Sequence, residues 1–185
     1  MWTSMNPSPD HHALVPFEPA TRAWFAAAFP APTPVQEAAW AAIGERQHTL
    51  VIAPTGSGKT LAAFLHAIDQ LYRQRLHDPV PRRTRVLYIS PIKALGADVQ
   101  RNLQLPLQGV DAERQRRGDP PVTLTVAVRT GDTPSAERAR MVRRPPDILI
   151  TTPESLFLML TSKARDTLRD VDTVIVDEIH AVAGG

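Results

Sequence analysis

A glycine-rich turn in the first third of the chain has the residue types and spacing of a phosphate-binding loop. Residues 53–60 read Ala-Pro-Thr-Gly-Ser-Gly-Lys-Thr and lie between a short apolar run and a helical pattern. Gly56 and Gly58 allow backbone N–H groups to turn inward around a phosphate. Lys59 can reach the outer phosphates of a nucleoside triphosphate, and the hydroxyl of Thr60 suits Mg²⁺. The loop residues expected to bind nucleotide are Thr55, Gly56, Ser57, Gly58, Lys59 and Thr60.

Two carboxylates follow an apolar run near the end of the chain. Asp177 and Glu178 come directly after the Val-Ile-Val of residues 174–176, and His180 follows. We expect Asp177 to hold Mg²⁺ through water and Glu178 to orient and deprotonate the attacking water. His180 either couples hydrolysis to motion or is an ordinary polar residue after the strand. With the loop, the pair predicts a site of nucleoside triphosphate hydrolysis, whose catalytic residues are Lys59, Asp177, Glu178 and His180.

The composition of the chain excludes several classes of protein. A length of 185 residues suggests one domain. The chain has no cysteine, which excludes disulfides and cysteine-based zinc sites. Its formal net charge of +2 gives no strong non-specific attraction to nucleic acid. No apolar run approaches the ~20 residues of a membrane span, and residues 1–10 lack a signal-peptide pattern, so the expected location is the cytoplasm.

Strand-like and helix-like patterns alternate from residue 50 onward. This alternation predicts a mostly parallel α/β sheet with helices on both faces, and several of the strands are continuously apolar, as buried parallel strands are. Residues 1–16 are expected to form a flexible lead-in and residues 17–185 a domain, with a surface loop over 114–121. The expected strands cover residues 50–53, 85–90, 122–128, 147–151 and 171–176. The expected helices cover residues 21–29, 34–43, 59–76, 134–143 and 153–160, and a further one starts at residue 91.

Three Ser-Pro or Thr-Pro pairs lie where an expected strand passes into an expected helix. They begin at Ser90, Thr133 and Thr152. Ser and Thr are good helix N-caps, and Pro fits the first helical position. In a parallel sheet these helix starts meet at the edge where ligands bind, and their free N–H groups suit phosphates. Capping alone also explains each pair, so both interpretations stay open.

The loop and the acid pair, taken with several intervening stretches, resemble superfamily 2 helicases. Residues 53–60 are similar to motif I and residues 177–180, Asp-Glu-Ile-His, to motif II. The combination of Arg-Thr-Gly-Asp-Thr with Asp-Ile-Leu-Ile-Thr-Thr-Pro-Glu-Ser-Leu most resembles the large helicase-related (Lhr) branch. The other similar stretches are 90–95 with motif Ia, 129–133 and 151–156 with the next two nucleic-acid-contacting motifs, and 29–36 with the adenine-sensing Q motif.

This resemblance implies a fold and an activity. The implied fold is a RecA-like P-loop NTPase domain that is incomplete at its C-terminus. The implied activity is ATP hydrolysis with Mg²⁺, coupled to translocation along single-stranded DNA and unwinding, with a role in DNA repair. Two alternatives stay open: an RNA-directed helicase of the same superfamily, with RNA or a DNA–RNA hybrid as substrate, and a non-catalytic fragment that binds nucleotide or nucleic acid.

The resemblance also assigns residues to the two ligands. Gln36 would hydrogen-bond the adenine edge and Phe17 would stack on the base, although the residues alone favour an exposed helix position for Gln36. Contacts to one nucleic-acid strand would be made to phosphates, which predicts sequence-independent and salt-sensitive binding. The residues implied for these contacts are Pro91, Lys93, Arg129, Thr130, Gly131, Thr152 and Pro153.

The resemblance implies further structural parts that lie outside the matched motifs. The resemblance implies a second RecA-like domain that supplies an arginine finger. It also implies a strand between the loop strand, 50–53, and the acid strand, 171–176. Without that shared neighbour, backbone groups in the middle of the sheet are unpaired, each at a cost of about 1–3 kcal/mol. We therefore expect this chain to be a poorly stable fragment by itself.

Overall fold

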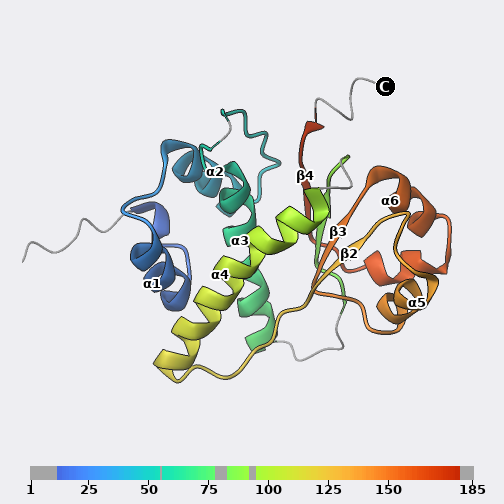
Figure 1. The fold of residues 1–185 in the computed structure, drawn as a ribbon. Helices are drawn as coiled ribbons and strands as arrows, with labels where there is room; N and C mark the ends of the chain where they lie inside the picture. The colour runs from blue at the N-terminus through green and yellow to red at the C-terminus, as the bar shows by residue number, and fades with distance from the viewer. Residues whose placement is uncertain (1–11, 55, 78–82, 92–94, 180–185) are drawn as a thin grey trace, which may run out of the picture.

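The expected parallel α/β sheet is confirmed by a computed structural model, which describes residues 12–54, 56–77, 83–91 and 95–179. Its four parallel strands lie in the order β2-β3-β1-β4, with helices on both faces (Figure 1). The strands are β1 (Val86–Ile89), β2 (Val126–Arg129), β3 (Ile148–Thr151) and β4 (Thr173–Val176). The helices are α1 (Pro19–Ala28), α2 (Pro34–Gly44), α3 (Lys59–His77), α4 (Leu95–Arg117), α5 (Ser135–Arg143) and α6 (Pro153–Leu160), with short 3-10 helices η1 (His12–Leu14) and η2 (Lys163–Leu168).

The four strands end in register. Arg129 of β2 pairs with Thr151 of β3, Thr151 with Ile89 of β1, and Ile89 with Val176 of β4. These four residues form a straight line, which we call the carboxyl edge; the opposite side of the sheet is the amino edge. With neighbouring strands about 4.8 Å apart, the carboxyl edge is about 15 Å long. Whatever follows each strand is therefore brought into one row.

Apolar side chains pack against both faces of the sheet. On one face, Tyr88 and Ile150 lie in a core formed with α3 and α4. On the other face, Leu149 packs against Met141 of α5 and Met159 of α6. Figure 1 shows the two helical layers on either side of the strands, with α1 and α2 outside α3 and α4. No helix in the described part of the chain is long and apolar enough to cross a membrane.

The expected strand over residues 50–53 is wrong. Residues 47–54 form no strand, and the side chains of Leu50 and Ile52 are 68% and 85% exposed. A strand is held by hydrogen bonds to a neighbour, and within the described residues the outer side of β4 carries none. The implied strand between these two segments is not among the described strands, and neither segment pairs with the other.

The expected surface loop over residues 114–121 begins later than predicted. Helix α4 continues to Arg117, and a glycine with positive φ, Gly118 (φ 75°), ends it. Arg114 is 3% exposed because its guanidinium lies 4.9 Å from the centre of the Tyr72 ring. The cationic residue therefore packs on an aromatic face in the core, where the sequence suggested a solvated loop.

The N-terminal segment is packed onto the outside of α3. Leu14 and Phe17 are buried with Phe25 of α1, Trp40 of α2 and Leu65 of α3. The expected lead-in, residues 1–16, falls mostly outside the described residues, but Leu14 is only 7% exposed. The packed part of the chain therefore begins before Phe17.

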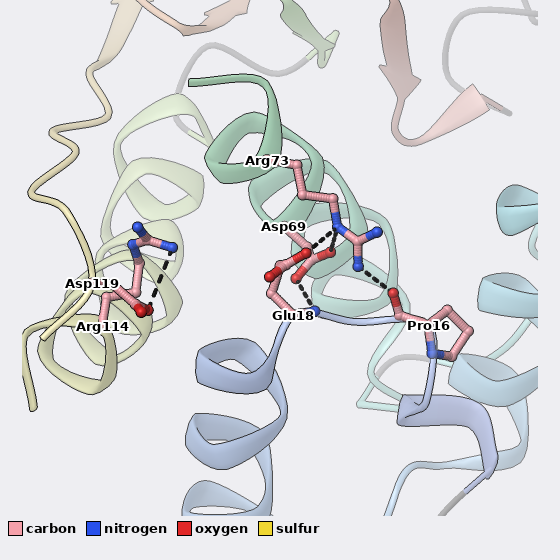
Figure 2. A network of polar contacts seen from close by, with 6 residues as sticks. All are labelled: Pro16, Glu18, Asp69, Arg73, Arg114 and Asp119. Carbon is pink, nitrogen blue, oxygen red and sulfur yellow. Dashed lines mark hydrogen bonds and ion pairs between the residues drawn. The ribbon is translucent and has the colours of Figure 1, made fainter. Parts of the chain in front are cut away.

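A buried carboxylate anchors the start of α1 to α3. Asp69 is 1% exposed, and its Oδ1 accepts a hydrogen bond from the backbone N–H of Glu18 at 2.9 Å. Arg73 lies between the two acids, with its Nε 3.0 Å from Glu18 Oε1 and 3.0 Å from Asp69 Oδ2, and it also donates to the carbonyl of Pro16 (Figure 2). Glu18 is the N-cap of α1 but makes no side-chain cap bond. Asp69 therefore caps α1 from a different helix.

We expect Asp69→Ala to lower the free energy of unfolding by about 2–4 kcal/mol, because the Glu18 N–H loses its acceptor and Arg73 loses the more buried of its two carboxylate partners. Asp69→Asn keeps an acceptor and is expected to cost only about half as much. Urea unfolding of both variants checks this, with the exposed Asp166→Ala as a control expected within about 0.5 kcal/mol of the parent. Equal losses for Ala and Asn would contradict the capping role.

The pH dependence of the free energy of unfolding provides a second test of the role of Asp69. Burial raises the pKa of Asp69 above its usual value, while Arg73 lowers it. A carboxyl whose pKa is raised by folding contributes stability below its unfolded pKa and loses that contribution as the pH rises through the folded pKa. The parent protein should therefore gain stability relative to Asp69→Asn as the pH falls from neutrality. A stability difference between the parent and Asp69→Asn that does not change with pH would contradict a pKa of Asp69 raised by burial.

Candidate nucleotide and nucleic-acid sites

The row along the carboxyl edge contains most of the residues that the sequence singled out. Asp177–Glu178 follows β4, Ser90–Pro91 follows β1, Thr152–Pro153 follows β3, and Thr130–Gly131 follows β2. Because the four strands end in register, these four pairs are neighbours in that order. The structure thus brings the expected acids and the expected nucleic-acid residues to one edge. Three further expected site residues, Thr55, Lys93 and His180, lie outside the described residues.

Helix α3 begins at Lys59 of the loop, and this end of the helix lies on the carboxyl side of the sheet. Near its C-terminal end, Arg75 pairs with Asp147 just before β3, and Gln74 Nε2 donates to Asp172 Oδ2 at 2.7 Å just before β4. These contacts hold the last turns of α3 at the amino edge. At 1.5 Å per residue, the helix rises about 24 Å from Arg75 back to Lys59. The start of α3, which is Lys59, therefore lies toward the carboxyl edge, and Figure 1 shows α3 running alongside the strands.

The first acid of the pair is held by two donors. The hydroxyl of Tyr88 donates to Asp177 Oδ2, and the backbone N–H of Glu178 donates to Asp177 Oδ1 at 2.9 Å. Glu178 has a φ of 52°, an uncommon left-handed conformation for this residue type. Burial and the Asp177 carboxylate both raise the pKa of Tyr88, so its hydroxyl stays protonated and remains a donor. Sequence reasoning missed Tyr88, because only the pairing of β1 with β4 brings it to Asp177.

The glycine-rich loop has the backbone that the sequence predicts. Gly56 and Gly58 both have positive φ values, 81° and 84°, which glycine adopts without strain. The Lys59 ammonium donates to the carbonyls of Ala53 and, at 3.4 Å, Pro54. The cationic side chain therefore faces the interior of its own loop, and Thr60 is exposed at the start of α3.

Helix α2 supports the loop from outside. Thr33 Oγ1 donates to the carbonyl of Ser57 at 3.0 Å, and Gln36 Nε2 donates to the carbonyl of Gly58 at 3.4 Å. Gln36 Oε1 also accepts from the Thr33 N–H at 2.9 Å, which completes a capping box. One turn later, the indole of Trp40 donates to the carbonyl of Ala62 at 2.8 Å. The loop and the first turn of α3 are thus tied to one neighbouring helix.

Gln36 and Phe17 have structural partners of their own. Gln36 is 4% exposed, so the exposed position that the residues alone favoured is wrong. Its amide retains a second N–H and a second acceptor lone pair, and its contact with adenine stays a prediction. Phe17 is also 4% exposed, and its ring packs edge-on against Trp40 with centroids 5.0 Å apart. The structure gives Phe17 a packing role, while stacking on a base stays a prediction.

The far end of the row carries a buried cation. Arg129 is 8% exposed, and its Nε and Nη1 have no hydrogen-bond partner among the described residues. Burial, and secondarily the nearby Arg138, lower the pKa of Arg129. A buried charge without a partner is costly. The site therefore favours an anion beside Arg129.

The three Ser-Pro or Thr-Pro pairs behave differently from one another. Thr152 caps α6 as expected: its Oγ1 accepts from the Ser155 N–H at 3.3 Å, and Pro153 is the first helical residue. The expected cap at Thr133 is wrong, because its Oγ1 accepts from the Thr130 N–H at 2.9 Å, and α5 begins one residue later than expected. The expected helix start at residue 91 is also wrong, since α4 begins at Leu95. One of the three pairs is therefore a helix cap.

Metal-binding groups are sparse in the described residues. No group of three or more His, Cys, Asp or Glu side chains among them could hold a metal ion. The residues proposed for Mg²⁺ are one carboxylate, Asp177, and one hydroxyl, Thr60. Mg²⁺ usually takes only one or two protein carboxylates and completes its shell with water and phosphate oxygens. This donor set suits Mg²⁺ held together with a nucleotide.

Comparison with known proteins identifies the family. The family model described as DEAD/DEAH box helicase matches residues 33–185. The chain is 60% identical to "Lhr helicase/uracil glycosylase" of Escherichia coli (strain K12), over 97% of this chain and 12% of that protein. It is 61% identical to "Lhr helicase/ probable uracil glycosylase" of Mycolicibacterium smegmatis, over 90% of this chain and 11% of that protein. The chain thus spans about one eighth of the length of these relatives.

Solved structures agree with this assignment. The chain is similar to the Mycobacterium smegmatis helicase Lhr, solved bound to ssDNA and AMP-PNP, with a TM-score of 0.85 and 61% identity over 92% of this chain and 21% of that one. The DEAD-box helicase Mss116, with a TM-score of 0.72 and 20% identity over 91% of this chain and 33% of that one, shares the fold. The expected RecA-like fold and the resemblance to the Lhr branch are both confirmed. The chain belongs to the DEAD/DEAH box helicase family and is similar to its Lhr helicases.

Proposed function

We propose that this chain binds ATP and Mg²⁺ at the carboxyl edge and that, within a full-length helicase, it couples ATP hydrolysis to translocation along single-stranded DNA and to unwinding. Lys59 and the loop amides hold the phosphates, and Glu178 orients and deprotonates the attacking water. When bound, Mg²⁺ would neutralise charge on the outer phosphates, held by Asp177 through water and by Thr60. The Mycobacterium smegmatis relative, bound to AMP-PNP, supports the choice of nucleotide.

One observation carries this proposal: the in-register ends of the four strands. They put the acid pair at one end of a row and Arg129 at the other, about 15 Å apart. The loop helix starts on the same side. A nucleotide at the Asp177 end and a nucleic-acid backbone at the Arg129 end would then share one rigid sheet, which is the arrangement a motor domain requires.

The nucleic-acid half of the proposal rests on phosphate chemistry. Two guanidinium nitrogens of Arg129, Nε and Nη1, have no partner among the described residues, and Thr152 lies at the start of α6, where the helix dipole carries partial positive charge. Thr130, Gly131 and Pro153 lie in the same row. Phosphate contacts carry no base sequence, so binding should be sequence-independent and sensitive to salt.

We expect Lys59→Ala and Glu178→Gln to fail at different steps in the full-length protein. Lys59→Ala should lose nucleotide affinity, because the ammonium that contacts the phosphates is gone. Glu178→Gln should bind ATP normally but lose about 10²–10⁴-fold in hydrolysis rate, since an amide is not a base. Fluorescent-nucleotide binding and single-turnover ATPase assays, with single-stranded DNA and RNA as separate stimulators, check this. Turnover of Glu178→Gln near the parent rate would remove Glu178 as the base.

The two loop glycines should respond differently to alanine. Gly56 and Gly58 both have positive φ, which costs alanine about 1–2 kcal/mol. A Cβ on Gly58 would also lie 2.5 Å from Gln36 Nε2, whereas one on Gly56 meets nothing within 4 Å. Gly58→Ala should therefore lower both the melting temperature and the nucleotide affinity more than Gly56→Ala does. Gly44→Ala, at an open helical position, is the control expected to be neutral or stabilising.

We expect Arg129→Ala to weaken single-stranded DNA binding about tenfold and to reduce the salt dependence of binding by about one counterion. The loss should be the same for unrelated DNA sequences. Arg117→Ala is the matched control, because Arg117 is exposed at the far end of α4. Fluorescence anisotropy across a salt series measures both quantities. An unchanged salt slope would contradict a phosphate contact at Arg129.

A further inference from the structure

The chain has two tyrosines, and both are buried, but only one reaches the row of candidate site residues. Tyr72 on α3 is 2% exposed, and its hydroxyl donates to the backbone carbonyl of Leu107 at 3.4 Å. Tyr88 on β1 is 1% exposed, and its hydroxyl donates to the carboxylate of Asp177. The two side chains are therefore matched in burial, but Tyr88 donates to a carboxylate whereas Tyr72 donates to a neutral carbonyl.

Tyr88 also contacts the loop helix. Its ring stacks on Phe64 of α3 with centroids 5.0 Å apart and an interplanar angle of 25°. Phe64 lies five residues after Lys59, little more than one helical turn from the loop. A continuous series of contacts thus runs from the start of α3 through Phe64 and Tyr88 to Asp177. It joins the two parts of the proposed nucleotide site through the core, without passing through a ligand.

We propose that Tyr88 is a positioning residue that fixes the orientation of the Asp177 carboxylate relative to the phosphate loop. This inference rests on the proposed function, because it assigns Tyr88 a role in the same nucleotide site. The hydroxyl of Tyr88 holds Oδ2, and the Glu178 N–H holds Oδ1. Both oxygens are thereby fixed, and each retains a lone pair that can accept from metal-bound water.

A hydrogen-bonded partner of this kind acts on the metal through the carboxylate. Outer partners of metal-binding groups fix their orientation, and losing one typically costs 10–100-fold in metal affinity or activity. Removing the Tyr88 hydroxyl leaves Asp177 with one of its two donors and free to rotate. The stacked ring and its packing stay, because phenylalanine has nearly the same shape. The loss should therefore appear in Mg²⁺ dependence and not in nucleotide affinity without metal.

The test compares Tyr88→Phe with Tyr72→Phe in the 185-residue chain. Each variant loses one buried hydroxyl and keeps its ring, and Tyr88→Phe should lower the melting temperature more, because the hydrogen bond it loses is charge-assisted. Binding of a fluorescent ATP analogue is then titrated with Mg²⁺. We expect the half-saturating Mg²⁺ concentration to rise about tenfold for Tyr88→Phe and to stay unchanged for Tyr72→Phe. In EDTA, the parent and both variants should bind the analogue equally.

A spectroscopic measurement tests the contact without removing it. Chain labelled with 3-fluorotyrosine gives two ¹⁹F resonances, which Tyr72→Phe assigns. Addition of AMP-PNP with Mg²⁺ should shift the Tyr88 resonance, and addition of AMP-PNP with EDTA should not. The Tyr72 resonance should stay in place throughout.

Two outcomes would overturn the inference. One is a Mg²⁺ requirement of Tyr88→Phe no different from that of Tyr72→Phe. The other is a Tyr88 resonance that does not shift when Mg²⁺ is added, or that shifts together with the Tyr72 resonance. If the parent chain melts cooperatively but shows no Mg²⁺-dependent nucleotide binding at all, the proposed function itself fails, and that result is distinct from either of these.

Discussion

The in-register parallel pairing of four short strands is the constraint on which the rest of this structure depends. Parallel pairing puts every strand end on the same side, and equal registers put those ends in one line. Segments separated by up to 88 residues along the chain, such as Ile89 and Asp177, then become neighbours through one backbone hydrogen bond of 2.9 Å. The proposed chemistry depends on this alignment, because neither the acid pair nor Arg129 has a local sequence neighbour that would place it.

The phosphate loop depends on a different support. The segment before it, residues 47–54, forms no strand, so the loop is held by the start of α3 and by α2 behind it. The start of α1 is in turn anchored to the second half of α3 by Asp69 and Arg73. Buried polar groups therefore hold the loop where the sheet does not, and the contacts to the Ser57 carbonyl and the Glu18 N–H each satisfy a backbone group.

A buried polar side chain lies near each end of the row: Tyr88 of β1 beside Asp177, and Arg129 at the end of β2. Tyr88 is satisfied within the protein and orients Asp177, whereas Arg129 keeps N–H groups that no described residue accepts. A satisfied buried group contributes rigidity, and an unsatisfied one contributes affinity for whatever supplies the missing partner. The sheet thus offers a fixed acid at one end and an anion site at the other.

The sequence by itself determined the layered fold and most of the local chemistry. Apolar periodicity located the helices, the glycines at 56 and 58 required the loop conformation, and the Thr-Pro pair at residues 152–153 located the start of α6. These features depend on residues within one or two turns of each other, which is the range that a sequence pattern encodes. The resemblance to helicase motifs then indicated which of these residues would contact nucleotide and nucleic acid.

Only the tertiary structure decided the rest. The apolar run at 50–53 has strand propensity but forms no strand, because a strand also needs a neighbour. The contact of Tyr88 with Asp177, the burial of Gln36 against the loop and the missing partners of Arg129 all depend on residues distant in sequence. Propensity acts within a few residues, whereas pairing, burial and hydrogen-bond satisfaction are properties of the assembled sheet.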